Sequence, residues 1–401
     1  MTSKKHVFVV GTFDTKAAEL TYAADLIRKT GVPVLTVDVS TQKHTTKCDV
    51  SAADVAHYHP SKADFLGSVA DRGEAVGLMA EALAEFVKSR GDLGGIIGMG
   101  GTGNTSLITA GMRALPVGVP KVMVSTVASG DVAAFVGPND ITMMYSVTDV
   151  AGINRISRHV LGNAAHAIAG MVSNTIPEAH DTKPALAMTM FGVTTPCVDA
   201  VRERLKAEYD PLVFHATGTG GQSMEKLIDS GMVSHVLDIT TTEVCDHRMG
   251  GVLSAGEDRL GAIIRRGIPY VGSVGALDMV NFWAKDTVPE KFKDRNLYVH
   301  NAYVTLMRTT VEENTRMGRW IGEKLNLMTG PVRFLLPEKG VSQIDSEGKP
   351  FYDPEADEAL FAALEDTVKQ NENRKLIRVP ANINDVEFVS ALIAAFRELH
   401  G

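Results

Sequence analysis

Cysteine is scarce in this chain of 401 residues, which has only Cys48, Cys197 and Cys245. Their odd number and wide separation, without C-x-x-C spacing, give no sign of a disulfide framework or a zinc site, and they fit a reducing compartment. A signal peptide is not indicated either, because only four apolar residues precede Gly11 after the polar start. We therefore expect a cytoplasmic protein.

Long apolar stretches and basic runs are also missing. No stretch reaches the roughly 20 apolar residues that cross a bilayer, so no membrane contact is expected. The net charge of −8 argues against a nucleic-acid partner, although small anions can still bind locally. Aromatic residues make up only 6%, beside 44% hydrophobic and 22% charged residues, which is typical of α/β proteins rich in small side chains.

Short β-rich apolar runs alternate with helical patterns nearly from end to end, which predicts parallel βαβ units. A chain of this length exceeds the usual single core, and residues 177–184 read as a linker. We expect an α/β protein of two Rossmann-like, doubly wound domains with mainly parallel sheets and a cleft between them. The first would span residues 1–178, and the second, with a C-terminal extension, residues 184–401.

The two halves repeat one plan. Predicted strands in the first half are residues 7–10, 34–37, 95–98, 122–124 and an edge strand at 141–145, followed by a connector helix over 150–175. The second half has predicted strands at residues 185–190, 211–215, 233–239 and 270–274. Because identity between the halves is low, a shared rhythm without shared ancestry is an equally good explanation.

A glycine-rich turn follows one of these strands. Residues 96–106 read Ile-Ile-Gly-Met-Gly-Gly-Thr-Gly-Asn-Thr-Ser, and a helical pattern then begins at Leu107. Glycines let the backbone approach a ligand, and a helix start favours a phosphate or carboxylate. The dinucleotide fingerprint lacks its acidic residue, since none occurs from Asn104 to Gly130, and Asn104 stands where a P-loop needs lysine. This predicts an anion cradle, with a plain tight turn as the alternative.

Other strand-end loops of the first half are polar. Asp14 either caps a helix or faces a ligand, where it would receive a ribose hydroxyl or Mg²⁺. Lys16 is either solvated or a phosphate partner. The loop that ends in Thr41 fits ribose or phosphate contact. Arg72, at a helix entrance, would bind phosphate through two donors or pair with Asp71.

The second half carries groups suited to proton transfer. The predicted catalytic residues are His215, Glu243, Asp246, His247 and Arg308. Glu243, Asp246 and His247 would serve as acid, base or metal ligands. Residues 217–222, Thr-Gly-Thr-Gly-Gly-Gln, are a second candidate anion loop. Arg308 stands among apolar residues and needs a partner, either a bound carboxylate or phosphate or Glu312 at i+4.

Six segments together resemble a known family. They are Gly-Thr-Phe-Asp-Thr-Lys (11–16), Asp-Val-Ser-Thr (38–41), Asp-Arg-Gly-Glu-Ala (71–75), Gly-Met-Gly-Gly-Thr-Gly-Asn-Thr-Ser (98–106), His-Asn-Ala-Tyr-Val-Thr-Leu-Met-Arg-Thr-Thr (300–310) and Arg-Phe-Leu-Leu-Pro-Glu-Lys-Gly-Val-Ser (333–342). The chain resembles, over nearly its whole length, the uncharacterised bacterial family related to the ATP-binding N-terminal domain of the tomato mosaic virus resistance protein.

This resemblance implies two Rossmann-like subdomains with ATP bound in the first. The implied nucleotide contacts are Asp14, Thr15, Lys16, Thr41, Arg72, Gly101, Thr102, Gly103, Asn104, Thr105 and Ser106. Asn104 departs from the glycine that relatives often carry there, which puts the backbone path of the loop in question. The plant relatives also carry a barrel resembling phosphoenolpyruvate hydrolases, so a separate TIM-barrel partner is a hypothesis. Virus inhibition belongs to the plant member and is not transferred.

The sequence supports three functional hypotheses. The first is an ATP-dependent enzyme, with Mg²⁺ as a candidate companion ion, that acts on a small carboxylate-bearing metabolite at the interdomain cleft. The second is a non-catalytic nucleotide or effector sensor. The third is an isomerase, lyase or hydrolase with its site in the second domain. An enzyme of this kind is commonly a symmetric homo-oligomer.

Overall fold

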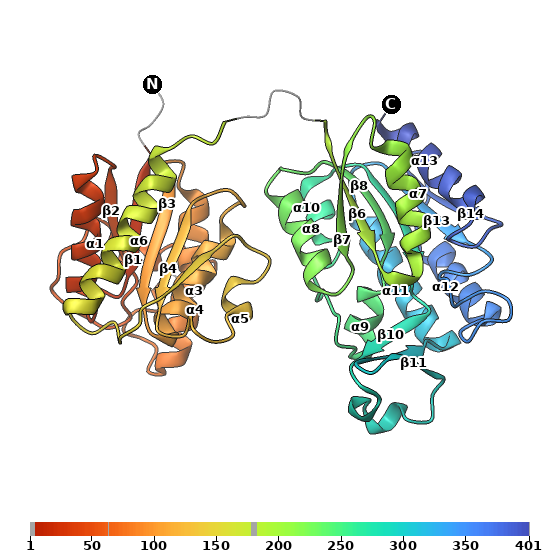
Figure 1. Ribbon diagram of the computed structural model, residues 1–401, viewed down its shortest axis with the longest axis horizontal. Coiled ribbons are helices and arrows are strands. Elements are labelled where there is room, and N and C mark those ends of the chain that lie inside the picture. The colour runs from red at the N-terminus through yellow and green to blue at the C-terminus, as the bar shows by residue number, and fades with distance from the viewer. Residues whose placement is uncertain (1–4, 63, 178–182, 401) are drawn as a thin grey trace. The chain divides into compact units, whose positions relative to one another are not determined.

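The computed structural model describes residues 5–62, 64–177 and 183–400. Contacts divide the chain into unit 1, residues 1–178, and unit 2, residues 179–401. Each unit has its own sheet and its own hydrophobic core (Figure 1). No helix within the described ranges combines the length and apolar character needed to span a membrane.

Unit 1 is a parallel sheet covered on both faces by helices. Its strands are β1 (His6–Gly11), β2 (Val34–Asp38), β3 (Leu93–Gly100), β4 (Lys121–Ser125) and β5 (Thr142–Tyr145), in the order β2-β1-β3-β4-β5. Its helices are α1 (Ala17–Lys29), α2 (Ala52–Ala56), α3 (Arg72–Ser89), α4 (Thr102–Ala114), α5 (Ala133–Val136) and α6 (Arg155–Ser173). Every strand pair is parallel, which confirms the predicted α/β class with a mainly parallel sheet.

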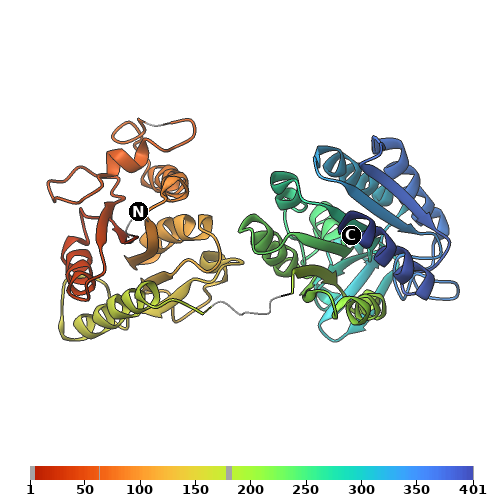
Figure 2. The same ribbon diagram turned by 90° about the horizontal axis from the view of Figure 1, so that it is seen from above.

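Alternate side chains of β1 build the two faces of this sheet, as the period of two in a strand requires. Phe8 and Val10 pack in the cluster that includes the apolar faces of α3 and α4. Val7 and Val9 pack in the cluster of α1 and α6 on the opposite face. Figure 2 shows these helices on both sides of the strands. The strand is therefore apolar throughout because both of its faces are buried.

The predicted connector helix of unit 1 begins later than the apolar pattern suggested. Its first residue is Arg155 instead of residue 150. The Asn154 side chain accepts the backbone N–H groups of Ile156 and Ser157 at 2.8 Å each, so it fixes the helix start as an N-cap.

Unit 2 contains a parallel sheet and a small antiparallel sheet. The parallel sheet has β6 (Ala185–Met190), β7 (Asp210–His215), β8 (His235–Thr240), β9 (Tyr270–Gly275), β13 (Val332–Pro337) and β14 (Arg374–Val379), in the order β14-β13-β9-β8-β6-β7. The antiparallel sheet has β10 (Met279–Phe282), β11 (Leu297–Asn301) and β12 (Val304–Arg308), in the order β10-β12-β11. The antiparallel sheet was not predicted.

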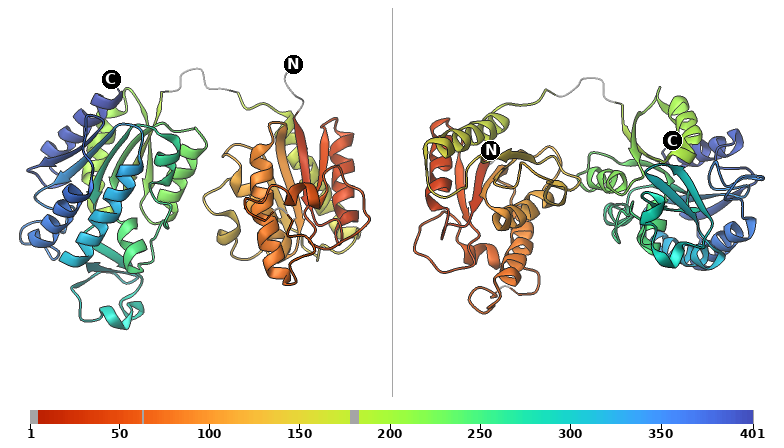
Figure 3. Two further views of the ribbon diagram at one scale, coloured as in Figure 1. Left: turned by 180° about the vertical axis from the view of Figure 1, so that it is seen from behind. Right: turned by 60° about the horizontal axis from the view of Figure 1, so that its bottom comes forward.

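Helices again cover both faces of the parallel sheet of unit 2 (Figure 3). The α-helices are α7 (Thr195–Leu205), α8 (Thr219–Asp229), α9 (Glu243–Met249), α10 (Gly261–Arg266), α11 (Val311–Leu327), α12 (Pro354–Thr367) and α13 (Val386–His400). Three short 3-10 helices are η1 (Gly192–Thr194), η2 (Lys285–Thr287) and η3 (Glu290–Phe292).

The strand orders of the two units match. In each parallel sheet the first strand along the chain lies between the second and the third, and the fourth and fifth then follow outward. Unit 2 adds β14 at the end of this series. In such a sheet the chain changes direction on either side of the first strand, and the crevice at the strands' carboxyl ends there is the usual place for a ligand.

Candidate functional site in unit 1

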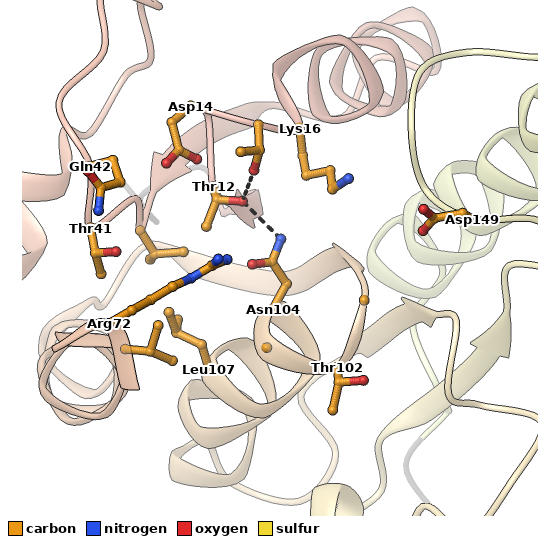
Figure 4. Close-up of a pocket in the computed structure, with 15 residues that line it drawn as sticks. Thr12, Asp14, Lys16, Thr41, Gln42, Arg72, Thr102, Asn104, Leu107 and Asp149 are labelled. Atoms are coloured by element: carbon orange, nitrogen blue, oxygen red, sulfur yellow. Dashed lines mark hydrogen bonds between the residues drawn. The ribbon is translucent and has the colours of Figure 1, made fainter. Parts of the chain in front are cut away.

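A cavity of about 540 Å³ lies at this position in unit 1 (Figure 4). It is lined by residues that follow β1, β2 and β3 and by the first turns of α3 and α4. All predicted nucleotide contacts except Thr105 and Ser106 line it. Four of the six segments that were grouped by resemblance, 11–16, 38–41, 71–75 and 98–106, therefore contribute residues to one cavity at the carboxyl edge of the unit 1 sheet, whereas 300–310 and 333–342 lie in unit 2.

The glycine loop forms one wall of the cavity. β3 ends at Gly100, and α4 begins at Thr102 with Gly101 as its N-cap, so no side chain caps the helix. The backbone N–H groups of its first turn therefore lack a side-chain acceptor. Gly100 has φ of +150°, and a Cβ there would lie 2.7 Å from the Asn104 side chain. Only glycine fits this position without distortion.

Side-chain hydrogen bonds hold the glycine loop in place. Asn104 Nδ2 donates to Thr12 Oγ1 at 2.9 Å, which ties the loop to the segment after β1. Thr105 is fully buried, and its hydroxyl donates to the Gly101 carbonyl at 2.9 Å and lies 2.7 Å from Ser125 Oγ. Thr105 thus positions the loop from behind instead of facing the cavity, and Ser106 is exposed outside the lining.

Two cationic side chains line the same cavity. Arg72 is the first residue of α3, and the Asp71 carboxylate accepts the Glu74 N–H at 2.7 Å as the helix cap. The alternative of an Arg72–Asp71 ion pair is therefore wrong: in the described part of the chain no hydrogen bond or ion pair engages the Arg72 side chain. Figure 4 shows this side chain extending across the cavity toward Asn104. The Lys16 ammonium donates to the Val150 carbonyl.

Asp14 does not cap a helix, which removes one of its two interpretations. The N-cap of α1 is Lys16, and its side chain does not cap the helix. The Asp14 backbone N–H donates to Ser40 Oγ at 3.1 Å, whereas its carboxylate Oδ1 is buried without a hydrogen-bond partner among the described residues. A buried polar atom without a partner is costly, so a ligand hydroxyl, a water or a cation would satisfy it.

Asp38, the last residue of β2, supports the loops around the cavity. Asp38 Oδ1 accepts the N–H groups of Phe13 at 3.1 Å and Ser40 at 2.9 Å and the Ser40 hydroxyl at 2.5 Å. Its Oδ2 lies 2.7 Å from His44 Nε2. Asp38 therefore joins the segments after β1 and β2, and Thr41 is the predicted contact of this loop that lines the cavity.

An apolar wall completes the cavity, and sequence reasoning missed it. Val39, Val76 and Leu107 line it together with the polar groups. Val76 lies four residues after Arg72, so both are on one face of α3, and Leu107 is the first apolar residue after the glycine loop. The spacing of Val76 from Arg72 and the position of Leu107 after the glycine loop are the sequence features that indicate this wall. Gln42 and Asp149 are further lining residues that were not predicted as contacts.

The glycine loop of unit 2, residues 217–222, is occupied by a side chain of the same unit. Glu243 is fully buried, and its Oε1 accepts the N–H groups of Gly218 at 2.8 Å and Gly221 at 3.0 Å. A Cβ on Gly221 would lie 2.1 Å from Glu243 Oε2. The expectation that residues 217–222 bind an external anion is therefore wrong, because the anion in this loop is the chain's own carboxylate.

A buried arginine accompanies Glu243. Arg259 Nε donates to Glu243 at 2.9 Å, and its two terminal nitrogens donate to Asp238 at 2.7 and 2.8 Å. Glu225 accepts from Arg259 at 3.1 Å, and the Tyr270 hydroxyl donates to Asp238 at 2.9 Å. Burial, which outweighs the nearby Arg259 charge, raises the pKa values of Glu225 and Glu243. No local sequence pattern indicates this network, because its members are far apart along the chain.

The remaining acid–base candidates of unit 2 do not form one cluster. Asp246 is fully buried and accepts the N–H groups of Asn281 at 2.7 Å and Leu253 at 2.8 Å, while burial raises its pKa to about 7. His247 Nε2 lies 2.6 Å from Glu257 on the surface. His215 ends β7 at the surface, and partial burial lowers its pKa. The described residues contain no group of three or more His, Cys, Asp or Glu placed to hold a metal. A catalytic role for these residues stays a prediction.

Arg308 has a partner other than the expected Glu312. Its guanidinium donates to Asp357 at 2.7 Å, to the Phe351 carbonyl at 2.7 Å and to Asp345 at 3.4 Å. Glu312 lies exposed in the first turn of α11. The expectation of an i+4 pair was wrong because α11 starts only after Arg308, so the two residues do not share a helix.

Comparison with known proteins identifies relatives of the whole chain. A UPF0261 protein of Rhizobium meliloti (strain 1021) is 59% identical over 98% of this chain and 99% of its own length. A UPF0261 protein of Clostridium tetani is 48% identical over 97% of both chains. The ToMV resistance protein Tm-1(GCR237) of Solanum lycopersicum is 45% identical over 98% of this chain, which spans 55% of the tomato protein.

Among solved structures, a UDP-GlcNAc 2-epimerase of Methanocaldococcus jannaschii aligns over 99% of this chain and 100% of its own at 8% identity, with a TM-score of 0.23. A likeness this weak supports no conclusion about the ligand.

Family models match both units. The N-terminal domain of the uncharacterised protein family UPF0261 matches residues 5–177, and the C-terminal domain of the same family matches residues 183–400. These matches end and begin on either side of the division between unit 1 and unit 2. The chain therefore belongs to the uncharacterised protein family UPF0261.

Proposed function

We propose that unit 1 binds ATP, with the phosphates on the backbone of residues 101–104. The observation that carries this proposal is an Arg72 guanidinium that no described residue engages, opposite a helix start without a side-chain cap, in one cavity of about 540 Å³. Both groups favour a phosphate, since one supplies charge-assisted donors and the other free N–H groups. The motif resemblance selects ATP among phosphate-bearing ligands.

The rest of the cavity suits the other parts of the nucleotide. Val39, Val76 and Leu107 supply an apolar surface for the base, and Thr41 supplies a hydroxyl for the ribose. The buried Asp14 Oδ1, which has no hydrogen-bond partner in the described part of the chain, fits either a ribose hydroxyl or Mg²⁺. A single carboxylate beside phosphate oxygens is a common way for proteins to hold Mg²⁺, because this ion keeps several of its waters. Mg²⁺ would screen phosphate charge there.

Two functional candidates remain for the use of the nucleotide. In the first, ATP is consumed in a reaction on a small carboxylate-bearing metabolite. In the second, the protein is a nucleotide sensor, which is favoured by the existing hydrogen bonds of Glu243 and Asp246 in unit 2. Turnover separates the candidates: phosphate release or transfer with sugar acids supports the enzyme, whereas ATP binding without turnover supports the sensor.

Calorimetric titration with ATP and Mg²⁺ tests the binding proposal. Replacing Arg72→Ala removes charge-assisted hydrogen bonds, which are worth about 1.5 to 3 kcal/mol, so the affinity should fall roughly 10- to 100-fold. Arg155→Ala is the matched control, because Arg155 is also the exposed first residue of a helix and lies outside the cavity. Equal ATP affinity in the two variants would contradict the proposal.

The relatives suggest two kinds of protein partner, which we give as proposals. The tomato protein extends well beyond the match, since this chain spans 55% of it. We propose that a separate TIM-barrel protein resembling phosphoenolpyruvate hydrolases associates with this chain, and that the chain forms a homo-oligomer. Co-purification with the barrel and sedimentation of the purified protein test the two proposals, and a monomer that retains no barrel at micromolar concentration would contradict both.

A further inference from the structure

Unit 1 has a second cavity, of about 660 Å³, beside the end of β2. Its walls come from the segment between β2 and α2, from the start of α2, and from Leu66 and Gly67. It shares Thr41 and Gln42 with the first cavity. Figure 4 shows these two residues on the side of the first cavity opposite Asp149. The two cavities therefore meet at the Thr41–Gln42 segment.

The first cavity already supplies each kind of surface that a nucleotide needs. It has a phosphate cradle, a carboxylate and a hydroxyl for the ribose, and an apolar wall for the base. Its volume of about 540 Å³ is within the range of roughly 300 to 1,000 Å³ that ligand pockets show. A nucleotide placed there leaves the second cavity for another ligand.

Several polar groups around the second cavity are already engaged. The Asp38 carboxylate is hydrogen-bonded to Ser40 and lies 2.7 Å from His44 Nε2. His44 Nδ1 accepts the Thr46 N–H at 3.2 Å, so Nε2 carries the proton and donates to Asp38. The Ser51 hydroxyl donates to Asp54 at 2.7 Å and caps α2. These groups shape the wall of the cavity and leave few acceptors for a ligand.

The uncommitted side chains of the second cavity define its chemistry. Thr41, Gln42, Lys43 and Thr46 line it, and no hydrogen bond or ion pair in the described ranges engages their side chains. Together they offer two hydroxyls, one amide and one ammonium group. Hydroxyls and an amide match a ligand with several hydroxyl groups, and the ammonium matches a negative charge.

The remaining wall is neutral. Burial raises the pKa of the Cys48 thiol to about 11, so it is uncharged at neutral pH and does not repel an anion. Ala52, Ala53 and Leu66 supply small apolar surfaces against which carbon atoms of a compact ligand can pack. The cavity thus combines a short apolar floor with hydrogen-bonding groups and one cation.

We propose that the second cavity binds a small polyhydroxylated anion, a sugar acid or a sugar phosphate, next to the nucleotide. Lys43 pairs with the negative charge, while Thr41, Gln42 and Thr46 hydrogen-bond the hydroxyl groups. The position of this ligand relative to ATP rests on the proposed function, but the binding of the anion does not. Because Thr41 and Gln42 border both cavities, occupancy of one cavity changes the affinity of the other, reciprocally.

Calorimetry with three probes tests this inference on the full chain, with and without ATP. D-gluconate represents the sugar acids, D-glucose 6-phosphate the sugar phosphates, and D-glucose is the neutral control. We expect at least one of the anions to bind and glucose to bind at least tenfold more weakly. Lys43→Met should weaken anion binding at least tenfold, whereas Lys47→Met, exposed in the same segment and outside the lining, should not.

A steric variant locates the binding site. Ala53 is exposed on α2 and lines the cavity, so Ala53→Trp fills the cavity without disturbing the core. Ala53→Trp should abolish anion binding. Its affinity for ATP, measured without the anion, should stay within about threefold of the wild-type affinity. His57→Trp, at the exposed end of the same helix and outside the lining, is the matched control.

Three outcomes would overturn the inference. The first is that neither anion binds, and the second is that Ala53→Trp binds the anion as tightly as wild type. The third is that Ala53→Trp weakens the binding of ATP instead of the anion, which would place part of the nucleotide in the second cavity. Failure of ATP to bind wild type would contradict the proposed function alone, since the gluconate and glucose 6-phosphate titrations without ATP still test the second cavity.

Discussion

Two carboxylates that follow strands, Asp14 and Glu243, differ in what surrounds them. Asp14 lines a cavity, and its Oδ1 accepts no hydrogen bond from any residue that the structure describes. Both oxygens of Glu243 accept hydrogen bonds from two backbone N–H groups and Arg259. The energetic reason is the same in both cases, because a buried carboxylate needs donors. In unit 2 the chain supplies those donors, whereas in unit 1 a ligand or its bound ion would.

Asp278 makes the folding stability of unit 2 depend on pH. It is fully buried, its Oδ1 has no partner among the described residues, and burial together with Asp345 raises its pKa from 3.8 to about 7. The folded state therefore holds a proton that the unfolded state releases, and this contribution to stability is full below pH 3.8 and lost as pH rises to about 7.

The Asp278→Asn variant tests this dependence. Between pH 5 and about 7.5 the wild type should lose more free energy of unfolding than the variant, by on the order of 1 to 3 kcal/mol at 1.36 kcal/mol per pKa unit. Urea unfolding of unit 2, followed by circular dichroism at both pH values, measures the loss. Parallel losses in the two proteins would show that Asp278 does not titrate in this range.

At the scale of elements, the strand-to-helix connections decide what each sheet can bind. The turn from β3 to α4 depends on Gly100 for its backbone conformation and on the Asn104–Thr12 hydrogen bond for its position. Asn104 thus joins the loop to the segment after β1. An N-cap without a side chain leaves the N–H groups of α4 available to a ligand.

Gly100→Ala should disrupt this turn. Its φ of +150° is unfavourable for alanine, and the new Cβ would lie 2.7 Å from Asn104. We expect ATP affinity to fall at least tenfold in calorimetry. Gly77→Ala is the matched control, since a Cβ at this position in α3 meets nothing within 4 Å and the helix should gain roughly 0.5 to 1 kcal/mol. A Gly100→Ala protein that binds ATP normally would rule out a role for this turn.

Local patterns predicted the strands of the two parallel sheets and the loops at their ends, because apolar runs and glycine turns depend on near neighbours, but they missed the antiparallel sheet of β10, β11 and β12. The same patterns could not predict which loops are occupied by other parts of the chain. Glu243 lies 25 residues from Gly218, and Arg308 lies 49 residues from Asp357, and both contacts form only when distant strands align. The expected pairing of Arg308 with Glu312 was wrong for this reason, whereas four of the six segments grouped by resemblance contribute residues to one cavity.

At the scale of the whole molecule, the two units share one strand order. The strand-end loops of unit 1 line a cavity, whereas the glycine loop of unit 2 holds the Glu243 carboxylate. Each unit has separate hydrophobic clusters on the two faces of its own sheet. The cavity of about 540 Å³ that is proposed to bind ATP is lined by residues of unit 1. Unit 1 therefore contains both the core that it needs to fold and the complete set of groups proposed to hold ATP.

A fragment of residues 1–178 should accordingly fold and bind ATP by itself. We expect a cooperative thermal transition in circular dichroism and an ATP affinity within about threefold of the full chain. A fragment of residues 179–401 should fold but show no ATP binding, because its glycine loop already holds Glu243. If only the second fragment bound ATP, the nucleotide site would have to be assigned to unit 2 instead of unit 1.

The most direct test of the account is a crystal structure of the full chain with Mg²⁺ and a non-hydrolysable ATP analogue. We expect phosphate oxygens within hydrogen-bond distance of the backbone N–H groups of residues 101–104 and of the Arg72 guanidinium, with the base against Val76 and Leu107. An analogue bound in unit 2, or an empty glycine loop at saturating analogue, would contradict it.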